Sequence, residues 1–161
     1  MTTEQQRAVE EFKALRGVEP FGPFVDLLVS PDLMSRVSAL GEYLRYRSAL
    51  PQRLSELAIL VTAAYWRQRF EWQIHAPIAL AAGLSLEKID AVWAQVPPPQ
   101  LEHDEQVVYD LCNALHKDHN VRPNLRARAH EVIGEQATID AIALCGYYAL
   151  LAMILNSRPL P

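Results

Sequence analysis

The sequence predicts an all-α protein built from about seven or eight helices. Apolar residues recur at helical spacing throughout the chain, and no segment shows the sustained alternation that is typical of a half-buried strand. The chain has 161 residues, of which 50% are hydrophobic and 21% are charged, so it is long enough to bury a core of ordinary size. No repeat or low-complexity tract divides it, and we expect residues 1–161 to form one domain.

Start and stop signals place the helices in order along the chain. Ser30 is suited to cap a helix that has Pro31 at its first position, and Asp32 favours the positive end of the helix dipole. Gly83 is expected just past the end of one helix, and Ser85 is expected to cap the next. The predicted helices cover residues 3–15, 31–46, 51–65, 70–82, 86–94, 102–117, 124–133 and 135–156, with a short apolar piece at 24–29 and a proline-rich break at 96–99.

The last predicted helix contains the longest uncharged run of the chain. Residues 141–155 carry no charge, but this run is shorter than the roughly 18–20 residues that a membrane-spanning helix needs. A helix that is apolar on all sides is typical of a core helix, or of one that packs against another subunit. We therefore expect one of these two roles and no membrane association.

Charge and cysteine usage exclude further classes. A net charge of −4 without a basic run argues against nucleic-acid binding, and the polar N-terminus lacks the layout of a signal peptide. Cys112 and Cys145 lie far apart in apolar helical patterns, so we expect no disulfide framework and a cytoplasmic location. His116 and His119, with Asp118 between them, offer too few ligands for a metal site.

Three polar residues, Glu56, Glu71 and His75, stand in one of the most apolar regions of the chain. Charged side chains seldom occupy such places unless they are paired or functional. If the two helices that carry them pack together, the three side chains could converge into an acid/base site. Glu56 could instead form a surface pair with Arg53, three residues earlier, and the sequence pattern alone leaves both interpretations open.

Glu71 and His75 are four residues apart, so they share one helix face and can hydrogen-bond. A carboxylate beside the imidazole should raise the pKa of His75, and histidine is well suited to proton transfer near neutral pH. The alternative is a core histidine that a glutamate satisfies, without catalysis. Tyr147 and Tyr148, on the apolar last helix, are expected to be core residues.

The chain resembles the carboxymuconolactone decarboxylase family of the alkylhydroperoxidase D-like superfamily, over about residues 30–157, with residues 1–29 as an N-terminal extension. The residues that carry the resemblance are Leu50-Pro51, Arg53, Glu56 to Leu60, Phe70-Glu71-Trp72, His75, Ala82-Gly83-Leu84-Ser85, Ile89, and Ala143 to Tyr148 with Leu150, Met153, Leu155 and Asn156. The resemblance implies an all-α fold and assembly into homo-trimers or hexamers.

The peroxidase branch of this superfamily carries Cys-x-x-Cys-x-x-x-His after a glutamate on the preceding helix. When Glu56 and His75 are matched to that pattern, Gln68 and Glu71 stand where the two cysteines would be. A thiolate is the nucleophile toward peroxides, and neither side chain can replace it. The sequence therefore argues against peroxidase activity by that route.

The decarboxylase branch carries Glu-x-x-x-His, as Glu71 and His75 do here, and removes carbon dioxide from 4-carboxymuconolactone without a cofactor. By this resemblance His75 is the acid/base, Glu71 orients it and Glu56 completes the catalytic set. The substrate-binding residues expected are Arg53, which could pair with a substrate carboxylate, together with Trp66, Trp72 and Gln68. Residues 45–51 depart from the aromatic Trp-x-Arg-Pro-Gly-Leu stretch that precedes the site helix in the true decarboxylases, so the substrate is not assigned.

The leading hypothesis is thus a cofactor-free and metal-free acid/base enzyme, a lyase, acting on a small carboxylated or lactone substrate. One alternative is a thiol-dependent oxidoreductase that uses Cys112 or Cys145. Another is a degenerate alkylhydroperoxidase-like protein, or a non-catalytic oligomeric binder of a small ligand.

Overall fold

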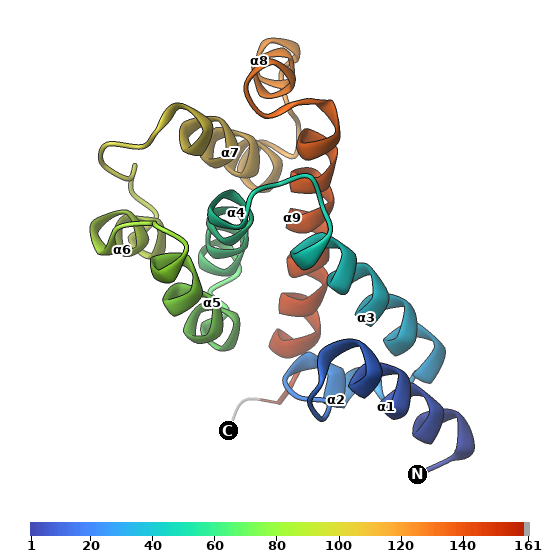
Figure 1. Cartoon of the computed structure of the whole chain (residues 1–161). Coiled ribbons are helices and arrows are strands. Elements are labelled where there is room, and N and C mark those ends of the chain that lie inside the picture. Colours follow the sequence, from blue (N-terminus) through green and yellow to red (C-terminus); the bar gives the residue numbers. More distant parts are fainter. Residues whose placement is uncertain (160–161) are drawn as a thin grey trace.

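The computed structural model describes residues 1–159 and confirms an all-α fold, without a strand in that range (Figure 1). The helices are α1 (Thr3–Arg16), α2 (Pro23–Leu27), α3 (Pro31–Tyr46), α4 (Gln52–Tyr65), α5 (Arg69–Ala81), α6 (Leu86–Ala94), α7 (His103–Asn113), η1 (Ala114–Asp118), α8 (Pro123–Ile133) and α9 (Glu135–Asn156). Residues 160 and 161, which belong to the predicted domain 1–161, lie outside the described residues.

Helix α4 forms the centre of the fold, because every residue from Leu54 to Ala64 on it is buried. It packs against α5, α6, α7 and α9, so that α5 and α6 lie on one side of it and α9 runs along another (Figure 1). Helices α1 to α3 form a second group beside the lower part of α9, with α1 packed on α3 and α2 on α9. Glu56 therefore lies on the central helix of the fold, and Glu71 and His75 are buried residues of α5, which packs against it.

Helix α9 has the bounds that the sequence predicts. It is long and apolar enough to cross a membrane by length and composition, and 56% of its most apolar window is buried inside the chain. Core helices of soluble proteins pass the same test. Its Asp140 is buried and accepts hydrogen bonds from the Tyr43 hydroxyl at 3.2 Å and the Ala49 amide at 2.8 Å, which fixes the connection between α3 and α4 to α9.

The helix ends mostly follow the predicted signals. The Ser85 hydroxyl accepts from the Lys88 amide at the start of α6, and Gly83 has a φ of +109°, which favours glycine. The Ser30 side chain, however, makes no capping hydrogen bond at the start of α3. The predicted helix 102–117 is also interrupted: α7 ends at Asn113, and the chain continues as the π-helical segment η1.

Candidate functional site

The centre of the site is the imidazole of His75, which lies between a carboxylate and a phenol. Its Nδ1 atom is 2.7 Å from the Glu56 carboxylate, and its Nε2 atom is 3.0 Å from the Tyr148 hydroxyl. These side chains come from α5, α4 and α9, and each is at most 4% exposed. Glu56 is therefore a buried carboxylate that contacts the imidazole, and no Arg53–Glu56 surface pair forms.

The hydrogen-bond pattern selects one tautomer of His75. Burial raises the pKa of Tyr148 well above its usual range, so its hydroxyl keeps its proton and donates to Nε2. A neutral ring that accepts at Nε2 carries its hydrogen on Nδ1, where it donates to the Glu56 carboxylate. Glu56 thus orients the ring in the way that a buried carboxylate orients a catalytic histidine.

The pKa of His75 is lowered, which corrects the expected rise. Burial disfavours the charged ring and outweighs the hydrogen bond and the charge of Glu56, which favour it, and the cations Arg45 and Arg16 add to the lowering. At neutral pH His75 is therefore a neutral imidazole.

Glu71 does not orient His75 as predicted. Its carboxylate lies 3.7 Å from Nε2, beyond hydrogen-bond distance, and Tyr148 takes that position instead. Burial raises the pKa of Glu71 to about 7, against the charge of Arg45, which lowers it. A carboxyl group whose pKa lies near neutral pH can both give and take a proton there, which is the property of a general acid/base.

A small cavity of about 30 Å³ opens beside His75 and Glu71, with room for one or two water molecules. Three polar atoms of residues that line it have no hydrogen-bond partner within residues 1–159: Nε of Arg16, Nε of Arg45 and the hydroxyl of Tyr147. The cavity is lined by Arg16, Phe21, Pro23, Phe24, Arg45, Phe70, Glu71, Ile74, His75, Tyr147, Tyr148 and Leu151. Two arginines, a glutamate and a neutral histidine therefore line one small cavity.

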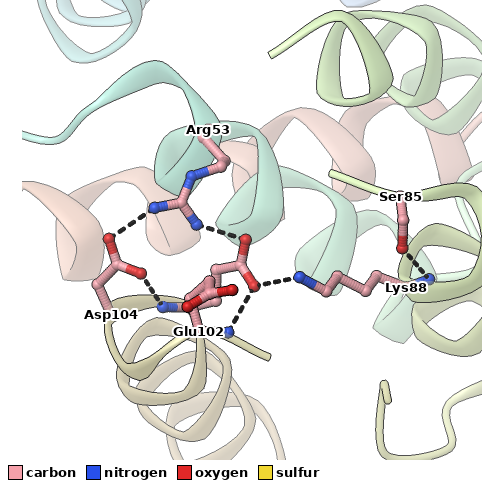
Figure 2. Close-up of polar contacts among 6 residues, drawn as sticks. Arg53, Ser85, Lys88, Glu102 and Asp104 are labelled. Carbon is pink, nitrogen blue, oxygen red and sulfur yellow. Dashed lines mark hydrogen bonds and ion pairs between the residues drawn. The ribbon is translucent and has the colours of Figure 1, made fainter. Parts of the chain in front are cut away.

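Arg53 lies elsewhere, which corrects the prediction that it lines the site. Its guanidinium group pairs with Asp104, at 2.7 Å, and with Glu105 at the start of α7 (Figure 2). The buried Glu105 also accepts from Lys88 of α6 at 2.7 Å. This network joins α4, α6 and α7. The guanidinium group of Arg53 therefore binds acidic side chains of the protein itself.

The other predicted binding residues serve the structure as well. The Gln68 side chain caps α5 by accepting from the Phe70 amide, and it donates to Asn156 at 2.7 Å. Trp72 packs on Trp93 with ring centroids 4.8 Å apart. The carbonyl of Trp66 accepts from Asn156. None of Gln68, Trp66 and Trp72 lines the cavity, whose aromatic wall comes from phenylalanines and tyrosines instead.

The residues that sequence reasoning missed are Arg16, Arg45, Tyr147 and Tyr148. Arg45 lies in the stretch where the chain departs from the decarboxylases, and Arg16 lies in the N-terminal extension. The available signal was an arginine in the last turn of each of two helices. No group of three His, Cys, Asp or Glu residues within 1–159 could hold a metal ion.

The fold and the site define a helical protein with a buried carboxylate–imidazole pair between α4 and α5. Residues 31–100 match the sequence profile of the Carboxymuconolactone decarboxylase family, which confirms the resemblance read from the sequence. The matched region holds Glu56, Glu71, His75 and Arg45. A comparison with curated protein sequences finds no match.

Two solved structures share the fold. The apo crystal structure of the debrominase Bmp8 is 14% identical, with a TM-score of 0.71 over 97% of this chain and 86% of Bmp8. A cysteine-to-alanine variant of the same debrominase, in complex with 2,3,4-tribromopyrrole, gives a TM-score of 0.69 at 14% identity over 97% of this chain and 85% of that chain. At this identity the likeness shows the alkylhydroperoxidase D-like helical fold alone.

Proposed function

We propose that the chain is a cofactor-free acid/base enzyme, of the lyase type, that acts on a small anionic substrate in the cavity beside His75. The observation that carries this proposal is the cavity itself, where a glutamate with a pKa of about 7 faces two arginines whose Nε atoms lack partners. Buried polar groups are normally satisfied, so unpartnered ones around a cavity favour a ligand or ordered water there.

The arginines define the chemical class of the ligand. Guanidinium groups bind carboxylates and oxyanions, and the low dielectric of an enclosed site strengthens that attraction. If they held the carboxylate that leaves as carbon dioxide, they would stabilise the ground state more than the transition state, which slows the reaction. We therefore assign Arg16 and Arg45 to a second carboxylate, or to the carbonyl oxygen on which negative charge develops.

The proton then has one suitable donor. When the carbon–carbon bond to the leaving carboxylate breaks, its electron pair delocalises onto the neighbouring carbonyl, and the carbon must be protonated. Glu71 in its protonated form gives that proton and recovers it from solvent, because its pKa of about 7 leaves both forms populated near neutral pH. His75, held by Glu56 and Tyr148, is a neutral ring, so it adds no positive charge beside the two arginines that bind the substrate anion.

The cavity must enlarge before it can hold such a substrate, because about 30 Å³ accommodates only water. Its cover is the segment around α2, which supplies Phe21 and Phe24. Arg158 holds this segment from outside through Asp26, at 2.5 Å, and the Gly22 carbonyl, at 2.8 Å. These contacts are exposed, so their loss costs little free energy, and we assign substrate entry to a displacement of α2.

Sulfur chemistry at this site has no support. Gln68 caps a helix and Glu71 lines the cavity at the two positions that carry cysteines in the peroxidase branch. We do not propose debromination for this chain either, because its likeness to Bmp8 extends to the fold alone.

The test is turnover of a panel of small carboxylated lactones, beginning with 4-carboxymuconolactone, measured as carbon dioxide release. His75→Ala should abolish turnover while the circular dichroism spectrum of a folded protein remains. His103→Ala, a change of an exposed histidine on α7, is the matched control and should leave turnover intact. If the wild-type chain releases no carbon dioxide from the panel, and small carboxylates fail to bind it in calorimetry, the proposal is wrong and the site is structural.

We also propose that the chain forms a homo-oligomer, as the family resemblance implies. Large apolar side chains are exposed on α2, α3 and α9 and in the connections between them, including Val25, Val29, Leu33, Leu40 and Met153. Covering such side chains is a common reason for subunit contact. Light scattering of the purified chain will give the number of subunits, and a monomer at micromolar concentration would contradict the proposal.

A further inference from the structure

A second cluster of reactive side chains lies apart from the cavity. Cys112 on α7 and Cys145 on α9 are free thiols whose Sγ atoms are 3.1 Å apart, although 33 positions separate them in the sequence. Both are buried, at 0% and 2% exposure. Neither lines the cavity beside His75, so the proposed acid/base chemistry does not use them.

A histidine accompanies the two thiols. The Thr62 hydroxyl donates its single hydrogen to the Ala58 carbonyl at 2.9 Å, so the contact of 2.9 Å between Thr62 and His116 requires Nε2 of His116 to be the donor. His116 lies on η1, and π-helical segments of this kind occur frequently at functional sites. The ring of Tyr65 stacks on His116 with centroids 4.9 Å apart and lies toward the surface.

We propose that Cys112 and Cys145 form a reversible dithiol–disulfide couple that peroxides oxidise, with His116 supporting the reactive thiolate. In the first step the Cys145 thiolate attacks one peroxide oxygen, the O–O bond breaks, and Cys145 becomes a sulfenic acid while water or an alcohol leaves. In the second step the Cys112 sulfur attacks that sulfenic sulfur, a disulfide forms, and water leaves. The two thiols lose two electrons and two protons in total, and the peroxide gains them.

The geometry requires little rearrangement. Sulfur atoms in a disulfide are about 2.05 Å apart, so the two Sγ atoms need to approach by about 1 Å. The electrostatics favour Cys145 as the thiolate, because the hydrogen bond between the two thiols lowers the pKa of Cys145 against the effect of burial, and His116 lowers it further. The same coupling raises the pKa of Cys112, which suits a resolving thiol.

We expect access to limit the rate, because both thiols are buried and the neighbouring His116 stacks against the ring of Tyr65, which lies toward the surface. Oxidation also reaches the first site indirectly. Cys145 lies three residues before Tyr148 on α9, so a covalent link at Cys145 is one helical turn from the hydroxyl that holds His75.

The experiment treats the folded, reduced chain with hydrogen peroxide, quenches it with a maleimide in denaturant and maps the sulfur state by mass spectrometry. We expect one intramolecular Cys112–Cys145 disulfide, reversed by dithiothreitol. Cys112→Ser should give no disulfide and leave Cys145 oxidised to sulfinic or sulfonic acid. If the wild-type chain keeps both thiols under conditions that oxidise the same chain in urea, or oxidises only beyond the disulfide level, the proposal is overturned.

Two further variants test the roles of the neighbours by the rate of disulfide formation. Tyr65→Ala should raise the rate several-fold by opening access to the thiols. His116→Asn should lower it several-fold and weaken the ultraviolet absorbance of the thiolate, whereas His119→Asn, at the exposed histidine that follows η1, should change neither. Equal rates and absorbance in both histidine variants would show that His116 does not support the thiolate.

Discussion

The buried carboxyl group of Glu71 makes the stability of the fold depend on pH in a way that one substitution removes. Its pKa rises from 4.5 to about 7 on folding, so between these values the folded chain binds more protons at Glu71 than the unfolded chain does. The stability that Glu71 contributes is therefore complete below about pH 4.5 and is lost as pH rises through 7. The loss corresponds to about 3 kcal/mol, since each pKa unit is worth about 1.4 kcal/mol.

Glu71→Gln keeps the shape of the protonated side chain and cannot ionise. At pH 4 we expect its free energy of unfolding to match that of the wild-type chain. At pH 8 we expect the variant to be more stable by up to about 3 kcal/mol, because the wild-type chain then holds a buried charge. Urea denaturation followed by circular dichroism across this range measures the difference, and subtracting the two curves removes the contribution of His75, which both chains share.

Glu87→Gln is the matched control, because Glu87 lies in the first turn of α6 as Glu71 lies in the first turn of α5, but it is exposed. Its effect should stay below about 1 kcal/mol at both pH values. Parallel stability curves for the wild-type chain and Glu71→Gln between pH 5 and 8 would refute the reasoning, since Glu71 would then ionise as easily in the folded chain as in the unfolded one.

Two other pairs of variants test, through the free energy of unfolding, a buried hydroxyl hydrogen bond and a partly buried ion-pair network. Tyr148→Phe removes the hydroxyl that donates to His75 and should lower the free energy of unfolding by about 1 kcal/mol. Tyr147→Phe removes a hydroxyl without a partner within residues 1–159 and should leave the free energy of unfolding unchanged or raise it. Equal losses in the two variants would contradict the hydrogen bond between Tyr148 and His75. Arg53→Ala leaves the buried Glu105 with Lys88 as its cation and should lower the free energy of unfolding by about 1–3 kcal/mol. Arg47→Ala, in an exposed pair, should lower it by less than about 1 kcal/mol. Similar losses for both variants in urea denaturation would show that the Arg53 network does not stabilise the fold.

Helical periodicity was sufficient to predict most of the fold, because each helix signals its own start and end locally. Helices α3, α6 and α9 have the predicted bounds, although the Ser30 side chain makes no capping hydrogen bond at the start of α3. The short helix α2 was predicted only as an apolar piece, since five residues are too few to show a period. The break at Asn113 was missed as well, because a π-helical turn keeps the apolar pattern of the α-helix around it.

The site was predictable in part for a related reason. Spacing within one helix identified Glu71 and His75, and the apolar surroundings of Glu56 identified that residue on the neighbouring helix. Hydrogen-bond partners on distant helices cannot be recognised from a local pattern in the sequence. Tyr148 lies 73 residues after His75, and the partners of Arg53 lie 51 and 52 residues after it. Whether an arginine pairs with a substrate or with the protein's own carboxylates is decided by the packing of helices, which no local pattern records.

The site around His75 and the pair of thiols Cys112 and Cys145 both use helices α4 and α9, so a movement of either helix affects both sites. Helix α4 supplies Glu56 to one and Thr62 to the other, while α9 supplies Tyr148 and Cys145. Close-packed helices transmit small shifts, so residues that share an element seldom act independently. A movement of α9 that brings the sulfur of Cys145 nearer to Cys112 also moves Tyr148 relative to His75. The proposed proton chemistry of the first cluster and the proposed thiol chemistry of the second would therefore be linked through helix α9, which carries Tyr148 and Cys145 together.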